Sequence, residues 1–315
     1  SFMFRIFFAT DVHGSDLCWK KFIAGAKFYE ANALVLGGDM TGKAVIPMVR
    51  GARGETRVEL MDQVHVLKDE EAVRAMETTI ANKGYYPVRL DEDQLADLRQ
   101  HPERIDALFT ERVILRVREW LAYAEAKLAG TAVRCYVCPG NDDAFAIDPI
   151  LQEAERICLG EGQVLAIEEQ ISMISTGWAN RTPWNTDREL DEADLEAKIE
   201  AMATGLPSST GWVFNLHCPP HKSGLDDAPE LDADMRPKYA GHILAAVGST
   251  AVRAMIEKYQ PPVSLHGHIH EGRGTSKIGR TICINPGSTY ESGTLLGAVV
   301  EFKGAKLADH RLTSG

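Results

Sequence analysis

Short apolar runs that end in small polar clusters are the feature that most constrains this fold. Residues 5–10 and 33–36 are apolar without helical spacing, and polar residues and glycine follow each run. Between them, apolar residues recur every three to four positions after Ser15, which predicts a capped helix. Strand, helix and strand in this order imply two parallel strands joined by a right-handed crossover. Open α/β sheets bind ligands at the carboxyl ends of their strands, so we expect the functional site there.

The same alternation continues in the second half of the chain. We predict further buried strands at 133–137, 164–167, 171–175, 213–216, 263–265 and 298–302. Asp148 and Pro149 form a suitable cap and first-turn pair for a helix, and another helix is predicted over 249–259.

Residues 43–120 break this alternation. The segments 45–49 and 57–66 flank RGARGE and fit a hairpin, a charged helical stretch follows from Asp69, and an amphipathic helix is expected over 102–128. These positions hold no catalytic cluster. We therefore predict one domain over residues 3–310, of class α/β. It would be a sandwich of two mixed β-sheets flanked by helices, with a mostly helical insertion or cap at about 43–120.

Composition narrows the class of protein. The 315 residues include 34 Lys and Arg against 45 Asp and Glu, a formal net charge of -11. This balance disfavours a nucleic-acid partner, because clustered Lys and Arg supply most of the affinity for phosphate backbones. Six cysteines in a chain of this length do not form a disulfide framework. Without an apolar run of membrane-spanning length or a visible signal peptide, we expect a cytoplasmic protein with no membrane partner, and a homo-oligomer is left open.

Polar clusters follow five of the predicted strands. They are Asp11 with His13, Asp39 after two glycines, Asn141 with Asp142, His217, and His268 with His270. Carboxylate, amide and imidazole side chains together are what two adjacent divalent ions need. The set contains no thiolate, which favours Mn, Fe, Zn or Co over Cu(I) or an iron–sulfur cluster.

The blocks DVH, GGD, GND, H and GHIH, in this order and at strand ends, resemble the calcineurin-like metallophosphoesterase superfamily. INPGS after the last block is also similar to members of that family, and the resemblance spans residues 4 to about 302 apart from the insertion. It implies a phosphoester substrate, in-line attack on phosphorus and two divalent metal ions (Mn, Fe or Zn). In the implied arrangement one ion is held by Asp11, His13 and His270, the other by Asn141, His217 and His268, and Asp39 bridges them.

Asp142 departs from the family pattern. Family members commonly place a histidine here, which contacts the substrate phosphate and can protonate the leaving group. An ionised carboxylate about 6 Å from the substrate would cost on the order of 2–3 kcal/mol per unit of substrate charge at an effective dielectric near 20. A dianionic monoester would suffer more than a monoanionic diester. Asp142 could act as a protonated acid, pair with His221 or His266, or only cap the turn.

Other candidate residues lie in loops. Asp143 matches the acidic residue that usually follows in the family, so the candidate catalytic residues are Asp142, Asp143 and His221, although His221 also fits an exposed loop residue. Asn180 and Arg181, in the aromatic loop GWANRTPWNT, are candidates for substrate binding, because a guanidinium suits phosphate oxygens.

Together these observations predict a metal-dependent phosphoesterase. A phosphodiesterase acting on a small nucleotide-like metabolite is the first choice. A phosphomonoesterase of the same mechanism and a non-catalytic metal-binding scaffold are the alternatives, and the acidic charge counts against a nuclease.

Overall fold

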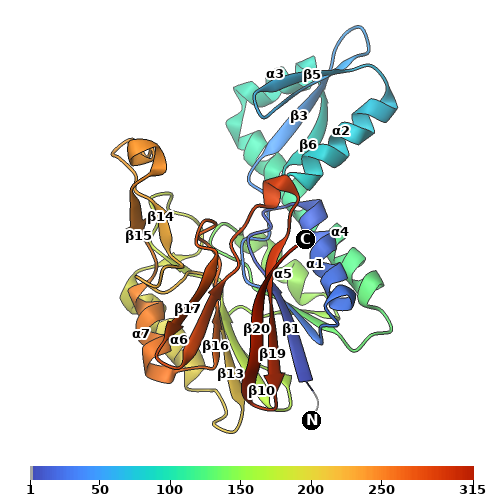
Figure 1. Cartoon of the computed structure of the whole chain (residues 1–315). Coiled ribbons are helices and arrows are strands. Elements are labelled where there is room, and N and C mark those ends of the chain that lie inside the picture. The colour runs from blue at the N-terminus through green and yellow to red at the C-terminus, as the bar shows by residue number, and fades with distance from the viewer. Residues whose placement is uncertain (1–2) are drawn as a thin grey trace.

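The computed structural model describes residues 3–315, which form two six-stranded mixed sheets packed face to face with helices outside them (Figure 1). The first sheet has the order β20-β19-β1-β2-β7-β8, with β1 Met3–Ala9, β2 Ala33–Leu36, β7 Arg134–Val137, β8 Ile157–Leu159, β19 Leu296–Lys303 and β20 Lys306–Ser314. The second has the order β17-β18-β16-β13-β10-β9, with β9 Gln163–Glu168, β10 Ile171–Thr176, β13 Gly211–Leu216, β16 Val263–Leu265, β17 Gly274–Ile278 and β18 Thr281–Asn285. The predicted two-sheet α/β class is confirmed.

The central strands are mostly apolar because each has two buried faces. In β1, Phe7 and Ala9 pack toward the outer helices, whereas Ile6 and Phe8 pack into the core between the sheets. Alternate side chains of a strand point to opposite faces, so both sets must be apolar here. This explains why the predicted strands show no polar alternation.

Five helices cover the outer faces of the two sheets. Helices α1 (Asp16–Phe28), α4 (Pro102–Leu128) and α5 (Asp148–Gln152) contribute to the core of the first sheet, and α6 (Glu192–Ala203) and α7 (Thr250–Tyr259) to that of the second. The Ser15 hydroxyl caps α1 by accepting a hydrogen bond from the Cys18 amide at 3.2 Å.

The insertion stands away from the sandwich (Figure 1) and contains its own four-stranded sheet in the order β5-β4-β3-β6. Its elements are β3 Val45–Arg50, β4 Thr56–Leu60, β5 Gln63–Leu67, α2 Glu70–Asn82, β6 Tyr86–Asp91 and α3 Glu92–Gln100. The expected hairpin is present as β3 and β4, which pair antiparallel. The single strand expected at 57–66 is instead two strands, because Met61 and Asp62 adopt φ of 51° and 60° and reverse the chain.

Smaller elements surround the edge where the strands end. They are η1 Phe145–Ile147, β11 Ala179–Asn180, β12 Glu189–Leu190, β14 Asp227–Pro229, η2 Lys238–Gly241, β15 Leu244–Ala246 and η3 Tyr290–Ser292. The sequence analysis did not predict these, nor α3, α6, β6, β8, β17, β18 and β20.

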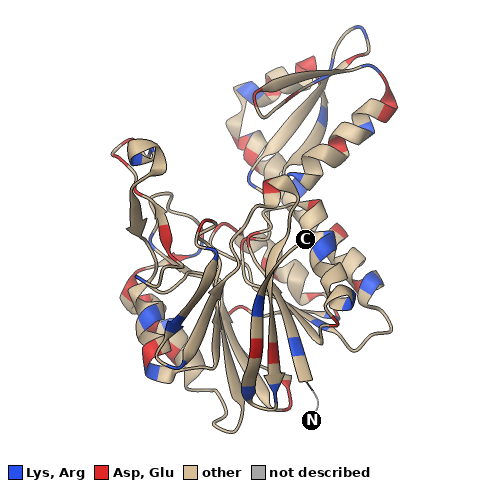
Figure 2. Ribbon diagram, viewed as in Figure 1, with Lys and Arg blue, Asp and Glu red and all other residues tan. Residues whose placement is uncertain are grey.

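Charge and cysteine placement agree with the composition. Lys and Arg are interspersed with Asp and Glu along the insertion and the outer helices (Figure 2). All six cysteines are free thiols, and burial raises the pKa of the Cys135 and Cys138 thiols, as expected for inert structural residues. Within residues 3–315, no helix combines the length and the apolar character needed to cross a bilayer.

Candidate metal centre

The structure brings all seven predicted ligand residues together at one edge of the sandwich. Each follows the carboxyl end of a strand. They are Asp11 and His13 after β1, Asp39 after β2, Asn141 after β7, His217 after β13, and His268 and His270 after β16. Five of the seven are buried, and His268 and His270 are partly exposed. The cluster is therefore open to solvent on the side of these two histidines.

One group of donors consists of Asp11, His13 and His270, whose ligand atoms lie within 4.8 Å of one another. His270 Nε2 is 3.3 Å from Asp11 Oδ1, and His13 Nε2 is 3.7 Å from the same oxygen. The two imidazole Nε2 atoms face each other at 3.1 Å. Three donor atoms aimed at one point form a set that a cation can occupy.

A second group consists of Asp39, His217 and His268, again with ligand atoms within 4.8 Å. His217 Nε2 lies 3.3 Å from Asp39 Oδ2 and 3.1 Å from Asn141 Oδ1. Asp39 Oδ2 is also 3.8 Å from His13 Nε2 of the first group. Asp39 thus belongs to the second group and also approaches the first, as a bridging carboxylate must.

Backbone strain accompanies the cluster. Asp11, His13, Asp39 and His268 all adopt positive φ, of 51°, 39°, 50° and 66°. Such conformations cost non-glycine residues free energy and persist only where the surroundings impose them. Here, backbone hydrogen bonds join the two loops: Asp11 N to Gly38 O at 2.9 Å and His13 N to Asp39 O at 3.0 Å. These backbone conformations direct the Asp and His side chains of the cluster toward a common space.

Close approach of the loops explains Gly140 in the GND block. A Cβ atom at this position would lie 2.1 Å from Asp39 Oδ1 and 2.3 Å from the Asp39 amide nitrogen. No side chain fits there without moving the carboxylate that lies between the two donor groups.

Gly140→Ala should therefore weaken metal binding by about tenfold or more, a loss in the range caused by disturbing the residues that orient metal ligands. Titration calorimetry with Mn(II) measures the effect. Gly274→Ala is the matched control, because its Cβ would make only an ordinary 3.5 Å contact with Leu225. Equal Mn(II) affinity of Gly140→Ala and the unaltered protein would contradict the proposed role of this glycine.

The protonation states of the cluster fit cation binding. Burial lowers the pKa of His13 to about 3 and that of His268 to about 4, so both are neutral with a lone pair available. Although burial opposes it, the carboxylates of Asp39 and Asp11 raise the pKa of His217 to about 10. Asp11 Oδ1 is buried and accepts no hydrogen bond from the described residues. Buried carboxylates with this arrangement need positive charge, and divalent ions would supply it.

Asp142 has a partner that the sequence analysis did not propose. Its Oδ2 lies 3.2 Å from the Lys43 ammonium, at the start of the insertion. The suggested pairing with His221 or His266 is wrong: His221 Nδ1 is 3.8 Å from Asp226 Oδ2, and the His266 ring contacts backbone carbonyls of residues 216 and 218. Burial, and then the nearby Asp39 carboxylate, raises the pKa of Asp142.

Asp143 is placed as a structural residue, which corrects its assignment as catalytic. Its carboxylate accepts hydrogen bonds from the amides of Met40, Thr41 and Gly140 at 3.0, 2.9 and 2.7 Å, and from the Thr41 hydroxyl at 2.6 Å. The residue has no exposed surface. Asp143 therefore ties the loop after β2 to the GND loop and does not face a substrate.

The two candidates for substrate binding are engaged elsewhere. Arg181 pairs with Asp191 at 2.8 Å, and its side chain is 56% exposed. The Asn180 amide donates to the carbonyls of Val247 and Gly248. Among residues 3–315, the side-chain hydrogen bonds and ion pairs of Asn180, Arg181 and His221 do not reach the seven candidate ligands.

Several residues that orient the site were missed by the sequence analysis. The Asn141 amide donates to the Thr186 hydroxyl at 2.9 Å, and Asn285 Nδ2 donates to the carbonyl of Ile269 between the two histidines at 2.9 Å. The Tyr290 ring packs against His13, with centroids 4.9 Å apart. The INPGS motif carried a signal for Asn285, and Tyr290 begins η3 two residues after that motif. Thr186 ends the aromatic loop GWANRTPWNT, in which the sequence analysis selected Asn180 and Arg181 instead.

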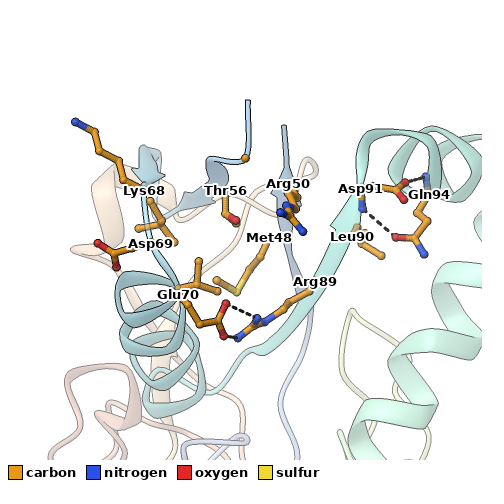
Figure 3. Close-up of a pocket in the computed structure, with 13 residues that line it drawn as sticks. Met48, Arg50, Thr56, Lys68, Asp69, Glu70, Arg89, Leu90, Asp91 and Gln94 are labelled. Atoms are coloured by element: carbon orange, nitrogen blue, oxygen red, sulfur yellow. Dashed lines mark hydrogen bonds and ion pairs between the residues drawn. The ribbon is translucent and has the colours of Figure 1, made fainter. Parts of the chain in front are cut away.

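A cavity of about 480 Å³ lies in the insertion, away from the ligand cluster. Its lining includes Arg89, which forms an ion pair of 2.9 Å with Glu70 (Figure 3). Arg89 also pairs with Glu77, at 2.6 Å. The basic and acidic side chains that line this cavity thus largely neutralise one another. The lining contains no member of the donor cluster.

Comparison with known proteins places the chain by sequence and by fold. No protein-family model matches it. An uncharacterized protein, MJ1162, from Methanocaldococcus jannaschii is 30% identical over 151 residues, which are 47% of this chain. The match covers 61% of the length of that relative.

Two solved crystal structures share the architecture over nearly the whole chain. One is TT1561 of Thermus thermophilus, with a TM-score of 0.55 and 11% identity, covering 100% of this chain and 99% of that one. The other has a TM-score of 0.56 and 15% identity and covers 99% of both chains. The chain therefore shares the fold of these two structures. A solved archaeal phosphodiesterase also matches, with a TM-score of 0.36 and 9% identity over 98% of this chain and 99% of that one.

Proposed function

We propose that this chain is a metallophosphoesterase that hydrolyses phosphoesters with two divalent ions, Mn, Fe or Zn, at the described cluster. The observation that carries the proposal is the convergence of two three-residue donor groups, the second of which contains Asp39, 3.8 Å from His13 of the first. Divalent ions bound there would supply Lewis-acid chemistry, neutralising phosphoryl oxygens and lowering the pKa of water.

The protein's own residues prepare the site for this role. His217 Nδ1 donates to the Gly37 carbonyl at 2.9 Å, which leaves Nε2 as the donor atom once the ring is neutral. The His268 amide donates to Asp11 Oδ2 at 3.0 Å and fixes the carboxylate so that Oδ1 faces the histidines. Pre-oriented ligands bind ions without a costly rearrangement.

We propose a phosphodiester of a small nucleotide-like metabolite as the first candidate substrate. The histidine that family members use on the phosphate is replaced by Asp142, and a carboxylate next to Asp39 disfavours a dianionic substrate over a monoanionic one. A phosphomonoester is the second candidate, and one observation favours it: Lys43 lies 3.2 Å from Asp142 and offsets its charge.

Hydrolysis of an aryl phosphodiester and the matching aryl phosphomonoester tests the proposal. We expect turnover of the diester with Mn(II) or Zn(II) and its loss after chelation, because the donor groups hold no substitute for the ions. The metal content of each sample, measured by elemental analysis, is the control for loading.

The outcomes separate the candidates. Equal or greater turnover of the monoester would favour the second candidate. No turnover of either ester by a protein that holds two ions per chain would contradict hydrolysis and leave a metal-binding scaffold.

A further inference from the structure

We propose that the ion pair between Lys43 and Asp142 selects the charge state of the phosphoester that this site accepts. The inference rests on the proposed function and adds a specificity-determining residue contributed by the insertion. Lys43 places an ammonium group next to Asp142, at the position where calcineurin-like metallophosphoesterases commonly carry a histidine.

The ion pair lies at the rim of the donor cluster. Lys43 Nζ is 3.2 Å from Asp142 Oδ2, and the Asp142 amide donates to Asp39 Oδ1 at 3.0 Å. Ligand atoms of Asp142, Asp39 and His13 lie within 4.8 Å of one another. The Lys43 side chain is 52% exposed and that of Asp142 23% exposed. Both charges therefore lie between the cluster and the solvent from which a substrate arrives.

The backbone beside Lys43 is anchored on the N-terminal side. The Thr41 amide donates to Asp143 Oδ1 at 2.9 Å, and the Gly42 amide donates to the Tyr86 hydroxyl at 2.7 Å. Tyr86 begins β6, which pairs with β3 starting two residues after Lys43. Lys43 thus lies between the loop that carries Asp39 and the sheet of the insertion. The backbone from which its side chain extends is therefore held on both sides.

Charge gives the two members of the pair opposite effects. With both present the pair is close to neutral. Removing the ammonium leaves the Asp142 carboxylate facing the substrate, which penalises a phosphomonoester dianion more than a diester monoanion. Removing the carboxylate charge leaves an unpaired ammonium, which favours the monoester. If the pair had a purely structural role, the two substitutions would not shift the preference between monoester and diester in opposite directions.

The experiment compares Lys43→Met, Asp142→Asn and the double variant with the unaltered protein. We expect the ratio of kcat/KM for the aryl monoester to kcat/KM for the aryl diester to fall about tenfold in Lys43→Met and to rise about tenfold in Asp142→Asn. Larger changes are not expected, because the pair is partly exposed and water and salt screen its charges. The double variant should return toward the unaltered ratio. Lys20→Met is the matched control, because Lys20 forms a 3.0 Å pair with Asp16 and is 49% exposed on α1.

A binding measurement separates this inference from the proposed function. Calorimetry with inorganic phosphate on the metal-loaded proteins should show weaker binding in Lys43→Met and tighter binding in Asp142→Asn, with or without turnover. Unchanged ratios and unchanged phosphate affinity would overturn the inference even if hydrolysis occurs. Loss of bound metal from Asp142→Asn would also overturn it, because Asp142 would then be a metal ligand and not the partner of Lys43.

Discussion

Asp39→Asn should reduce metal-dependent kcat/KM by about 10³-fold or more, equivalent to about 4 kcal/mol of transition-state stabilisation. Asp39 Oδ2 lies 3.3 Å from His217 Nε2 and 3.8 Å from His13 Nε2, one histidine from each donor group. The amide keeps the shape of the side chain but removes the negative charge that both groups share. We therefore expect the bound metal to fall below two ions per chain, measured by elemental analysis alongside turnover.

The control for Asp39→Asn is Asp191→Asn. Asp191 is also a carboxylate paired with a basic residue, but its side chain is 70% exposed and its partner is Arg181 on the surface. This variant should keep its turnover and its metal. The bridging role of Asp39 would be refuted by an Asn variant that binds two ions and keeps more than a tenth of the unaltered activity.

The loss of Asp39 charge should also be visible without any substrate. In the metal-free protein, the Asp39 and Asp11 carboxylates hold the pKa of His217 at about 10 against the effect of burial. Removing the Asp39 charge removes the stronger of the two carboxylate effects on this ring, so the pKa of His217 should fall. The shift can be followed by nuclear magnetic resonance of the ring, which checks the electrostatic argument independently of turnover.

Much of the fold could be predicted because its strands are buried on both faces. A run such as residues 33–36 has no other stable location than the centre of a sheet covered by helices and a second sheet. The strands that were missed have weaker patterns. β20 at the edge of the first sheet is mostly exposed, and its neighbour β19 alone fixes its register. Its position depends on tertiary pairing, which local sequence does not encode.

The clustering of the seven candidate ligands could be predicted because each lies shortly after the end of a predicted strand. Parallel strands bring their carboxyl ends to one edge, so order along the chain translates into proximity. The residues around the cluster did not follow this rule. Lys43 reaches Asp142 from the insertion, and Asp143 turns away from the site although it is next to Asp142 in sequence. Side-chain direction in a loop is set by hydrogen bonds that only the folded structure reveals.

Arg188→Met should lower the free energy of unfolding by about 3–5 kcal/mol, the usual cost of breaking a buried ion pair. The Arg188 side chain is 1% exposed. It donates to the Asp143 carbonyl at 2.9 Å and to the Asp148 carboxylate at 2.6 and 3.1 Å. Methionine fills part of the volume but leaves the Asp148 carboxylate without its partner. Chemical denaturation of the metal-free protein measures the effect.

Arg181→Met is the matched control, because this neighbouring arginine forms an exposed pair with Asp191 and should cost no more than about 1 kcal/mol. A loss below about 1 kcal/mol in Arg188→Met would contradict the assigned role. The same variant should weaken metal binding, since it removes the guanidinium that donates to the carbonyl of Asp143, two residues after Asn141. In Arg188→Met, the free energy of unfolding and the metal affinity should fall together, because the substitution loosens the loop that carries a candidate ligand. In Asp39→Asn, the metal affinity should fall because a candidate ligand loses its charge.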